Sequence, residues 1–376
     1  MVVSELDPGP GSEPTPRHLR AVVGRAVHLL FLGVTVAGVL AAATALTLPT
    51  WARYLPMGLT VVLLGLPHGA VDHLVPSRLG ETVPVRSARP GAAAVGLLYL
   101  LLGGAYALVW LAAPQVAALA FVGLTWLHWG QGDVWALREL LGAEHLRSRR
   151  LRAATLVVRG GLPMLVPLLA APERYRAVLS AWVALFETGL DLPWLFAPRT
   201  RAALGAGFAA LSVGTLAVGR LVVDDDAARR GWRIDAAEVA LLWAFFLLVP
   251  PLVAIGLYFA CWHSLRHVAR LLLLAPDREP PTESVAFAVW LWGAGRRFAR
   301  EAAPLTALSL LLLAGFGAVV PATARTVPEY AALYLVFVAV VTLPHVVVVT
   351  LMDYAEGLWA DGSRTREPPR PTSRGR

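Results

Sequence analysis

The 376-residue sequence has no lysine, a single cysteine and few charged residues. Because Cys261 has no second cysteine to pair with, an internal disulfide and a metal site built from several thiolates are both excluded. Charged residues make up 15% of the chain, against roughly 25% in an ordinary soluble domain. The composition therefore excludes a disordered, collagen-like or coiled-coil chain and argues strongly against a water-soluble enzyme.

Apolar residues account for 57% of the chain, and the mean hydropathy is +0.62. A helix that crosses a bilayer needs about 20 mostly apolar residues. Ten stretches meet that need: 26–48, 55–75, 91–113, 116–137, 153–171, 178–197, 202–223, 239–274, 302–320 and 327–351. We therefore predict an all-α, polytopic membrane helix bundle with about 8 to 10 transmembrane helices. The weakest span is 178–197, which contains acidic residues and a proline, and 239–274 is too long for one crossing.

The two ends of the chain differ in composition from the rest. Residues 1–25 are rich in Pro, Gly, Glu and Arg and lack the apolar core of a cleavable signal peptide. We predict a disordered cytoplasmic segment over 1–25, one integral membrane catalytic domain over 26–355, and a disordered Arg/Pro-rich tail over 356–376.

All 33 basic residues are arginines, and the net charge is +8. They gather in alternate gaps, before the first span and after each even-numbered span, which predicts a multi-pass protein of the cell membrane with both termini in the cytoplasm. This placement argues against a nucleic-acid partner. The loop 224–233 is an exception, since three arginines share it with three aspartates. The alternative is that arginine simply fills every loop.

Six of the nine histidines lie in even-numbered spans. They are His68 and His73 in the second span, His128 in the fourth, His263 and His267 in the eighth, and His345 in the tenth. Each falls in the half of its span nearer the predicted cytoplasmic side, so the six share one depth. Because ionisable side chains are costly inside a bilayer, they form a candidate functional site.

Spacing indicates which of these side chains can meet. His263 and His267 are four residues apart, so on a helix they lie on one face and can bind one ion together. His68 has the same spacing to Asp72, whereas His73 points about 140° away from His68. We therefore interpret His68 as a ligand and Asp72 or His73 as a supporting residue.

Asp133 follows His128 in the stretch LHWGQGD and can orient a histidine by accepting its second N–H. Prolines precede His68 and His345. A proline kinks a helix, so two kinks at the depth of the histidines predict a chamber there.

Arg266 lies between His263 and His267. Four outcomes stay open for its guanidinium: contact with Asp72, with Asp133 or with Asp353, or extension to the cytoplasmic interface.

Aromatic residues flank the histidines and can wall a tunnel for a long apolar substrate, although helix packing explains them nearly as well. The candidates are Trp126, Trp129, Tyr258, Phe259 and Trp262. Of the other histidines, we expect His28 in a hydrogen bond between helices, and His18 and His145 in solvated loops.

Imidazole is the dominant donor and no thiolate cluster is available, so iron, copper or zinc fits best. A histidine centre within lipid suits iron and dioxygen acting on a hydrophobic molecule, because both the molecule and O2 partition into the bilayer.

Four ordered motifs carry a resemblance to a known family. They are GLPHGAVDH at 65–73, LHWG at 127–130 with Asp133, WHSLRH at 262–267, and LPH at 343–345 with Met352 and Asp353. Together they resemble the Brp/Blh family of membrane β-carotene 15,15′-dioxygenases. The resemblance spans about residues 55 to 355.

This resemblance implies cleavage of the central 15,15′ double bond of β-carotene by O2 at a non-haem Fe(II), with retinal as the product and an opsin as its receiver. It places the iron ligands on His68, His128, His263 and His267. The span 26–48 receives no role from it, and neither His345 nor Asp353 receives a ligand role. We keep both as candidate supporting residues, and for His345 binding to the metal stays an equal alternative. The alternatives are a regulatory or accessory membrane protein in retinal supply, and a metal or ion transporter. Di-iron hydroxylases and cytochrome b-like haem proteins need histidine patterns that this sequence lacks.

Overall fold

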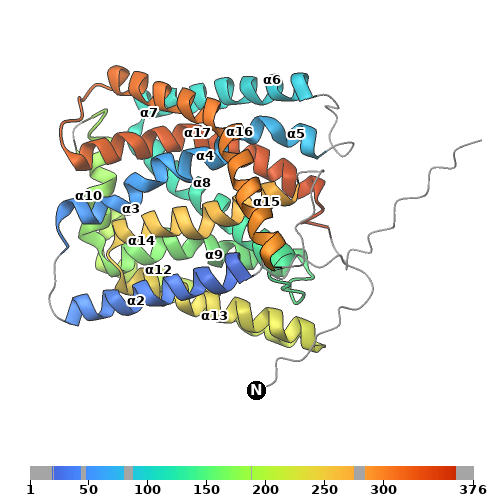
Figure 1. The fold of residues 1–376 in the computed structure, drawn as a ribbon. Coiled ribbons are helices and arrows are strands. Elements are labelled where there is room, and N and C mark those ends of the chain that lie inside the picture. The colour runs from blue at the N-terminus through green and yellow to red at the C-terminus, as the bar shows by residue number, and fades with distance from the viewer. Residues whose placement is uncertain are drawn as a thin grey trace, which may run out of the picture.

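The computed structural model describes residues 19, 21–43, 48–79, 88–187, 189–274 and 284–360, and within them every regular element is a helix (Figure 1). This confirms the predicted all-α class. The predicted terminal segments lie largely outside the described residues. Ala21–Ala26, however, forms a π-helix (η1) that continues into α2, so helix begins before the predicted first span.

Among the described residues, six helical runs are long and apolar enough to cross a membrane: Gly24–Ala41, Gly91–Ala112, Arg149–Ala170, Pro198–Leu221, Val285–Val319 and Val327–Ala355. They correspond to α2 (Val27–Ala43), α6–η4–α7 (Ala88–Leu98, Tyr99–Gly103, Gly104–Ala112), α9 (Arg149–Ala170), α12 (Pro198–Leu221), α16 (Ser284–Val319) and α17 (Val327–Ala355). Large apolar side chains stand exposed on their outer faces, such as Leu221 (83%) and Val285 (77%). Apolar surface on this scale is suited to contact with lipid rather than water.

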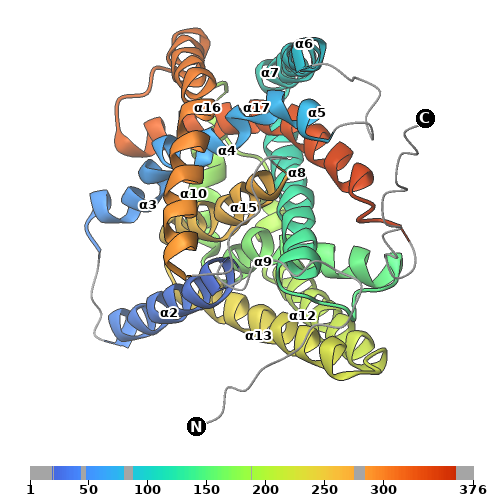
Figure 2. The ribbon, with the colours of Figure 1, turned by 45° about the vertical axis from the view of Figure 1, so that its right-hand side comes forward.

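Helix α8 (Pro114–Trp135) packs directly along α9, and glycine explains the close approach. A Cβ atom at Gly160 would overlap the carbonyl oxygen of Trp126, and one at Gly130 would overlap that of Leu156. Small residues allow two helix backbones to touch in this way. In the turned view of Figure 2, α9 lies at the centre of the bundle, with α2, α12 and α13 (Asp226–Leu248) below it.

Two predicted spans are broken by proline. The second becomes α3 (Thr50–Val62), α4 (Gly65–Ala70), a 3-10 turn η2 (Asp72–Leu74) and α5 (Val75–Arg78). The eighth, predicted as one run over 239–274, is divided at Pro250 and Pro251. Helix α13 ends before these prolines, and α14 (Pro251–Leu257), a π-helix η6 (Tyr258–Ser264) and α15 (Leu265–Leu273) follow them. Consecutive prolines cannot continue the hydrogen-bond ladder of a helix, so the long run becomes two separate segments.

The predicted sixth span, 178–197, is not a membrane-length helix. It comprises the end of α10 (Pro172–Val183), an irregular stretch and the short α11 (Pro193–Phe196). Gln115, at the start of α8, donates to the Glu187 carboxylate at 3.0 Å and accepts from the Asp191 backbone at 3.0 Å. In Figure 1, α10 stands across one end of the long helices. The acidic residues are thus held at the end of the bundle.

An ion pair between two loops corrects the predicted topology. Arg147, which follows α8 and η5 (Ala136–Leu140), donates to Asp224 at 2.6 Å and to Asp225 at 3.3 Å. This contact lowers the pKa of the Asp224 carboxyl. The ten-span prediction put these loops on opposite sides, but the structure places them at the same end. The structure differs from that prediction in two places: 178–197 forms no membrane-length helix, and 239–274 is divided into separate helical segments.

Candidate metal centre

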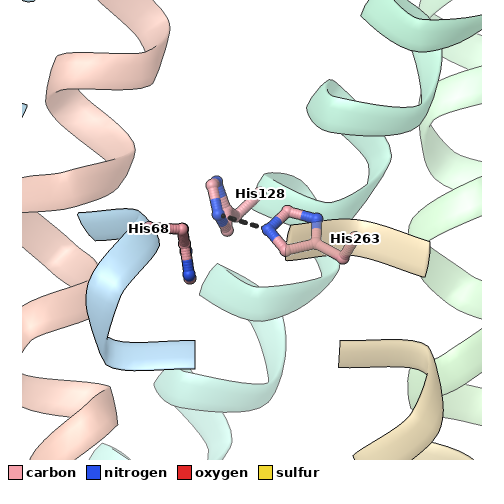
Figure 3. A group of neighbouring side chains, drawn as sticks. All are labelled: His68, His128 and His263. Carbon is pink, nitrogen blue, oxygen red and sulfur yellow. Dashed lines mark hydrogen bonds between the residues drawn. The ribbon is translucent and has the colours of Figure 1, made fainter. Parts of the chain in front are cut away.

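Five histidines from five helical segments meet in the bundle interior. His68 comes from α4, His128 from α8, His263 from η6, His267 from α15 and His345 from α17, and all five are buried. The ligand-capable atoms of His68, His128 and His263 lie within 4.8 Å of one another. Figure 3 shows these three rings facing a common space, with the Nε2 atoms of His128 and His263 3.0 Å apart. The structure therefore brings together all four histidines predicted as ligands, together with His345.

The remaining two rings adjoin this group. The His267 ring centre lies 5.4 Å from that of His68, and the His345 ring centre lies 4.7 Å from that of His128. His263 and His267 stack nearly parallel, with an interplanar angle of 13°, as expected from their spacing of four residues.

The donor chemistry of this cluster fits a bound cation. His68 donates from Nδ1 to the Leu64 carbonyl at 2.9 Å, which leaves its Nε2 with a free lone pair. Within the described part of the chain, the buried atoms Nδ1 of His128, Nε2 of His267 and Nε2 of His345 have no hydrogen-bond partner. Buried polar atoms normally have partners, so several orphaned imidazole nitrogens around one space are the pattern that a metal ion would satisfy.

Asp72 and His73 do not support His68 as the sequence suggested. Asp72 instead accepts from Nδ1 of His345 and from the Tyr99 hydroxyl, each at 2.7 Å. His73 donates from Nδ1 to the Ala70 carbonyl at 3.0 Å. The reason is local, because the chain leaves α4 at Ala70 and enters a 3-10 turn, so the spacing of a continuous α-helix no longer applies.

Asp133 does not contact a histidine; it belongs to a buried ion network. Its carboxylate accepts from Trp262 Nε1 at 3.0 Å and pairs with Arg266 at 3.2 Å. One of the four outcomes left open for Arg266 is therefore the observed one. Arg266 also pairs with Glu238 at 2.5 Å, and Arg159 pairs with the same carboxylate at 2.8 Å. This network adjoins the segment that carries His263 and His267.

Sequence reasoning missed Glu238, Arg159 and Asp235, and Asp353 does not pair with Arg266. Arg159 lies in the middle of the predicted span 153–171, so the rule that buried charge marks function could have found it. Asp235 completes the network, pairing with Arg159 at 2.7 Å. Asp353 lies elsewhere and pairs with Arg270 at 2.9 Å.

Of the other histidines, His28 confirms its expectation and His145 contradicts it, while the prediction for His18 lies outside the described residues. His28 on α2 contacts Glu238 on α13 at 2.5 Å, so it joins two helices as predicted. His145 was expected in solvent, but it is 1% exposed and lies 3.2 Å from the Asp235 carboxylate. The loop after α8 folds back onto α13, where Gly231 has no side chain that would block the approach.

A large cavity of about 1460 Å³ opens beside the histidines. His68, His128 and His345 lie in its wall, which is otherwise mostly apolar. Of the five aromatics predicted to wall a tunnel, Trp129 and Phe259 line the cavity.

The other three predicted tunnel aromatics pack between helices instead. Trp126 donates to the Val157 carbonyl of α9, Tyr258 stacks on Trp262, and Trp262 lies under the Arg266 guanidinium. They lie on the faces of α8 and η6 that turn towards other helices.

The fold and the site together define a helical protein of membrane type with a buried polyhistidine centre beside an apolar cavity. The sequence model of the family described as "Beta-carotene 15,15'-dioxygenase" matches residues 59–353. The chain is 46% identical over 345 residues to "Probable beta-carotene 15,15'-dioxygenase Blh" of Halobacterium salinarum, covering 92% of this chain and 96% of that protein. It is 32% identical over 320 residues to "Probable beta-carotene 15,15'-dioxygenase Brp" of the same species, covering 80% of this chain and 84% of that protein.

The chain therefore belongs to the β-carotene 15,15′-dioxygenase family. A more distant relative, the "Beta-carotene 15,15'-dioxygenase" of an uncultured marine bacterium, is 26% identical over 209 residues, covering 55% of this chain and 65% of that protein. No solved structure matches the chain.

Proposed function

We propose that this protein cleaves the central 15,15′ double bond of β-carotene with O2, giving two molecules of retinal. The observation that carries the proposal is the group of buried imidazoles in the wall of an apolar cavity of about 1460 Å³. Breaking one C=C bond and forming two aldehydes is an oxidation that one molecule of O2 balances. Family membership specifies the carotene bond, and the site supplies donors suited to O2 chemistry.

Fe(II) is the metal we propose, held by His68, His128, His263 and His267. Iron bound by imidazole, with a position left open, supplies the redox chemistry that lets O2 react with an alkene. The protein's own contribution is positional. His68 is fixed by the Leu64 carbonyl, and His128 is fixed by the close packing of α8 on α9. Rigid placement of donors on helices preserves the site geometry during turnover.

The apolar cavity would select and align the substrate. Its lining runs from Phe121 and Val122 on α8 to Leu335 and Val338 on α17, so a polyene can lie along it without burying polar groups. The histidines occupy one stretch of this wall. A bond held beside them reacts as if intramolecular, and its position along the cavity decides where the chain is cut.

Co-expression in carotene-producing cells tests the activity. We expect the orange colour to fade and chromatography to show retinal as the sole cleavage aldehyde. Unchanged carotene with uptake of a metal would favour the transporter alternative. Unchanged carotene without such uptake would favour a regulatory role. Aldehydes of unequal length would show cleavage at another bond and contradict the proposed one.

Narrowing the cavity beside His128 is expected to slow turnover without removing the metal. Thr125 lies one helical turn before His128, lines the cavity, and its hydroxyl makes no hydrogen bond within the described chain. Thr125→Phe should lower retinal formation roughly 10- to 100-fold, because a small displacement of the reacting bond is costly. Val116→Phe is the matched control, since Val116 is 61% exposed on the same helix and lies outside the cavity lining. Equal retinal formation by both variants would contradict the assigned cavity.

We further propose that the protein crosses the cell membrane about ten times, with both termini in the cytoplasm. The six long helical runs are then joined by α3–α5, α8, α13 and α14–α15, while α10 stays at the outer end. This arrangement places Arg147 and Arg229 together on the cytoplasmic side, and places Arg199 and Arg201, at the start of α12, on the outer side. Retinal released into the bilayer would be available to an opsin.

A further inference from the structure

His345 is not among the four ligands that the family resemblance implies. A chain of hydrogen bonds holds its side chain. Its Nδ1 donates to Oδ2 of Asp72 at 2.7 Å, and the Tyr99 hydroxyl donates to the same oxygen at 2.7 Å. Asp72 is 1% exposed and His345 is 4% exposed. Because a carboxylate accepts the Nδ1 proton, the lone pair of His345 lies on Nε2.

That Nε2 atom is buried and makes no hydrogen bond to any described residue. A carboxylate that fixes one nitrogen of an imidazole, with the other nitrogen unpartnered and the ring beside other histidine rings, is the arrangement found around metal-binding histidines. His73 offers the contrast within the same segment. His73 is half-buried, and its Nδ1 donates to the Ala70 carbonyl. Within the described part of the chain, no contact between its ring and the five clustered histidines is observed.

The distances between ring centres extend the argument. An imidazole bound at about 2.1 Å has its ring centre roughly 3.2 Å from the ion, so two rings on one ion have centres about 4.5 to 6.5 Å apart. Pairs that involve His345 measure 5.1 Å to His68, 4.7 Å to His128 and 5.2 Å to His267. Four of the six pairs among the other four histidines measure from 4.6 Å for His128 and His263 to 6.5 Å for His263 and His267. By ring-centre distance His345 therefore lies as close to the group as His267 does, although the ligand atoms that lie within 4.8 Å of one another belong to His68, His128 and His263.

We propose that His345 is a fifth imidazole ligand of the metal, positioned by Asp72 and Tyr99. This inference rests on the metal centre of the proposed function. Five protein ligands would leave a single position for O2, and the Asp72 link would couple α17, η2 and η4 to the ion. Asp72 and Tyr99 are then positioning residues that act through His345.

The test is metal binding by the full-length protein in detergent, with Co(II) as the probe after removal of bound metal with a chelator. We expect wild type to bind one Co(II) with visible d–d bands. His345→Ala should weaken binding by more than about 100-fold and change those bands, and Asp72→Asn should weaken it about 10- to 100-fold. Tyr99→Phe should have a smaller effect in the same direction. His73→Ala is the matched control and should bind as wild type does.

Added imidazole provides a second readout, because it should restore the wild-type bands to His345→Gly. X-ray absorption of Co(II)-loaded wild type counts the imidazoles without any mutation, which covers the case that the variants fail to fold. Five imidazoles support the inference, and four contradict it. If wild type binds Co(II) but His345→Ala binds it with equal affinity and the same bands, the inference fails and the four-histidine centre stands. If wild type binds neither Co(II) nor Fe(II), the metal centre of the proposed function itself fails.

Discussion

Replacing His263 with alanine is expected to remove both the metal and the activity. His263 lies at the contact point of the cluster, with its Nε2 3.0 Å from that of His128 and its ring centre 5.7 Å from that of His68. Mutating a residue that supports a metal ligand lowers metal affinity about 10- to 100-fold. Removing a direct ligand should therefore lower the affinity by more than roughly 100-fold. Retinal formation should fall at least as far, because O2 chemistry depends on the ion.

The measurement is iron content by elemental analysis of the detergent-purified variant, alongside retinal yield from β-carotene. His73→Ala is again the control for metal content, since it removes the imidazole of η2 that donates to the Ala70 carbonyl. Full iron content together with full retinal yield in His263→Ala would overturn the ligand assignment. Full iron content with lost activity would instead move His263 from metal binding to substrate positioning.

The histidine cluster could be predicted because buried ionisable groups are costly wherever they stand along the chain. Spacing alone paired His263 with His267, and their stacked rings agree with that pairing. The same reasoning failed for His68 and Asp72, because it assumed a continuous helix where a 3-10 turn follows Ala70. A proline in an apolar run indicates a kink, but its position does not fix which partner the next side chain will reach.

The topology shows a different limit. Hydropathy detects apolar content, and both α13 with α14–α15 and the α10–α11 region contain enough of it. It cannot see that Pro250 and Pro251 divide the run 239–274 into separate helical segments, nor that Gln115 holds Glu187 at the end of the bundle. Contacts between the loops are needed to show that they share an end, such as the ion pair of Arg147 with Asp224 and the approach of His145 to Asp235.

The ion network was hidden for a third reason, because its members come from four helical segments that are distant in sequence. Asp133 and Arg266 were both recognised as unusual, and their contact was among the outcomes considered. Glu238 lies one residue before the predicted span 239–274, so hydropathy alone does not mark it as buried. In the structure it is 1% exposed and bridges two guanidinium groups.

Glu238→Ala is expected to destabilise the protein strongly. Its carboxylate pairs with Arg266 at 2.5 Å and with Arg159 at 2.8 Å, and both arginines are almost completely buried. Removing Glu238 takes away the carboxylate that Arg266, Arg159 and His28 all contact, and leaves these groups without that partner. Breaking a buried pair by removing one partner costs about 3 to 5 kcal/mol. Glu238→Gln keeps the shape and hydrogen-bonding capacity, and its effect should fall between alanine and wild type.

The apparent Tm in detergent, at a fixed heating rate because unfolding of such proteins is often irreversible, measures this effect. Asp224→Ala is the matched control: it also removes an acid from an arginine pair, but the Asp224 side chain is 59% exposed, so the Tm should not change measurably. Because Arg266 lies between His263 and His267 on the same segment, Glu238→Gln should also weaken Co(II) binding even where the protein stays folded. A Glu238→Ala variant with the Tm of Asp224→Ala and wild-type Co(II) affinity would show that the network neither stabilises the bundle nor positions the histidines.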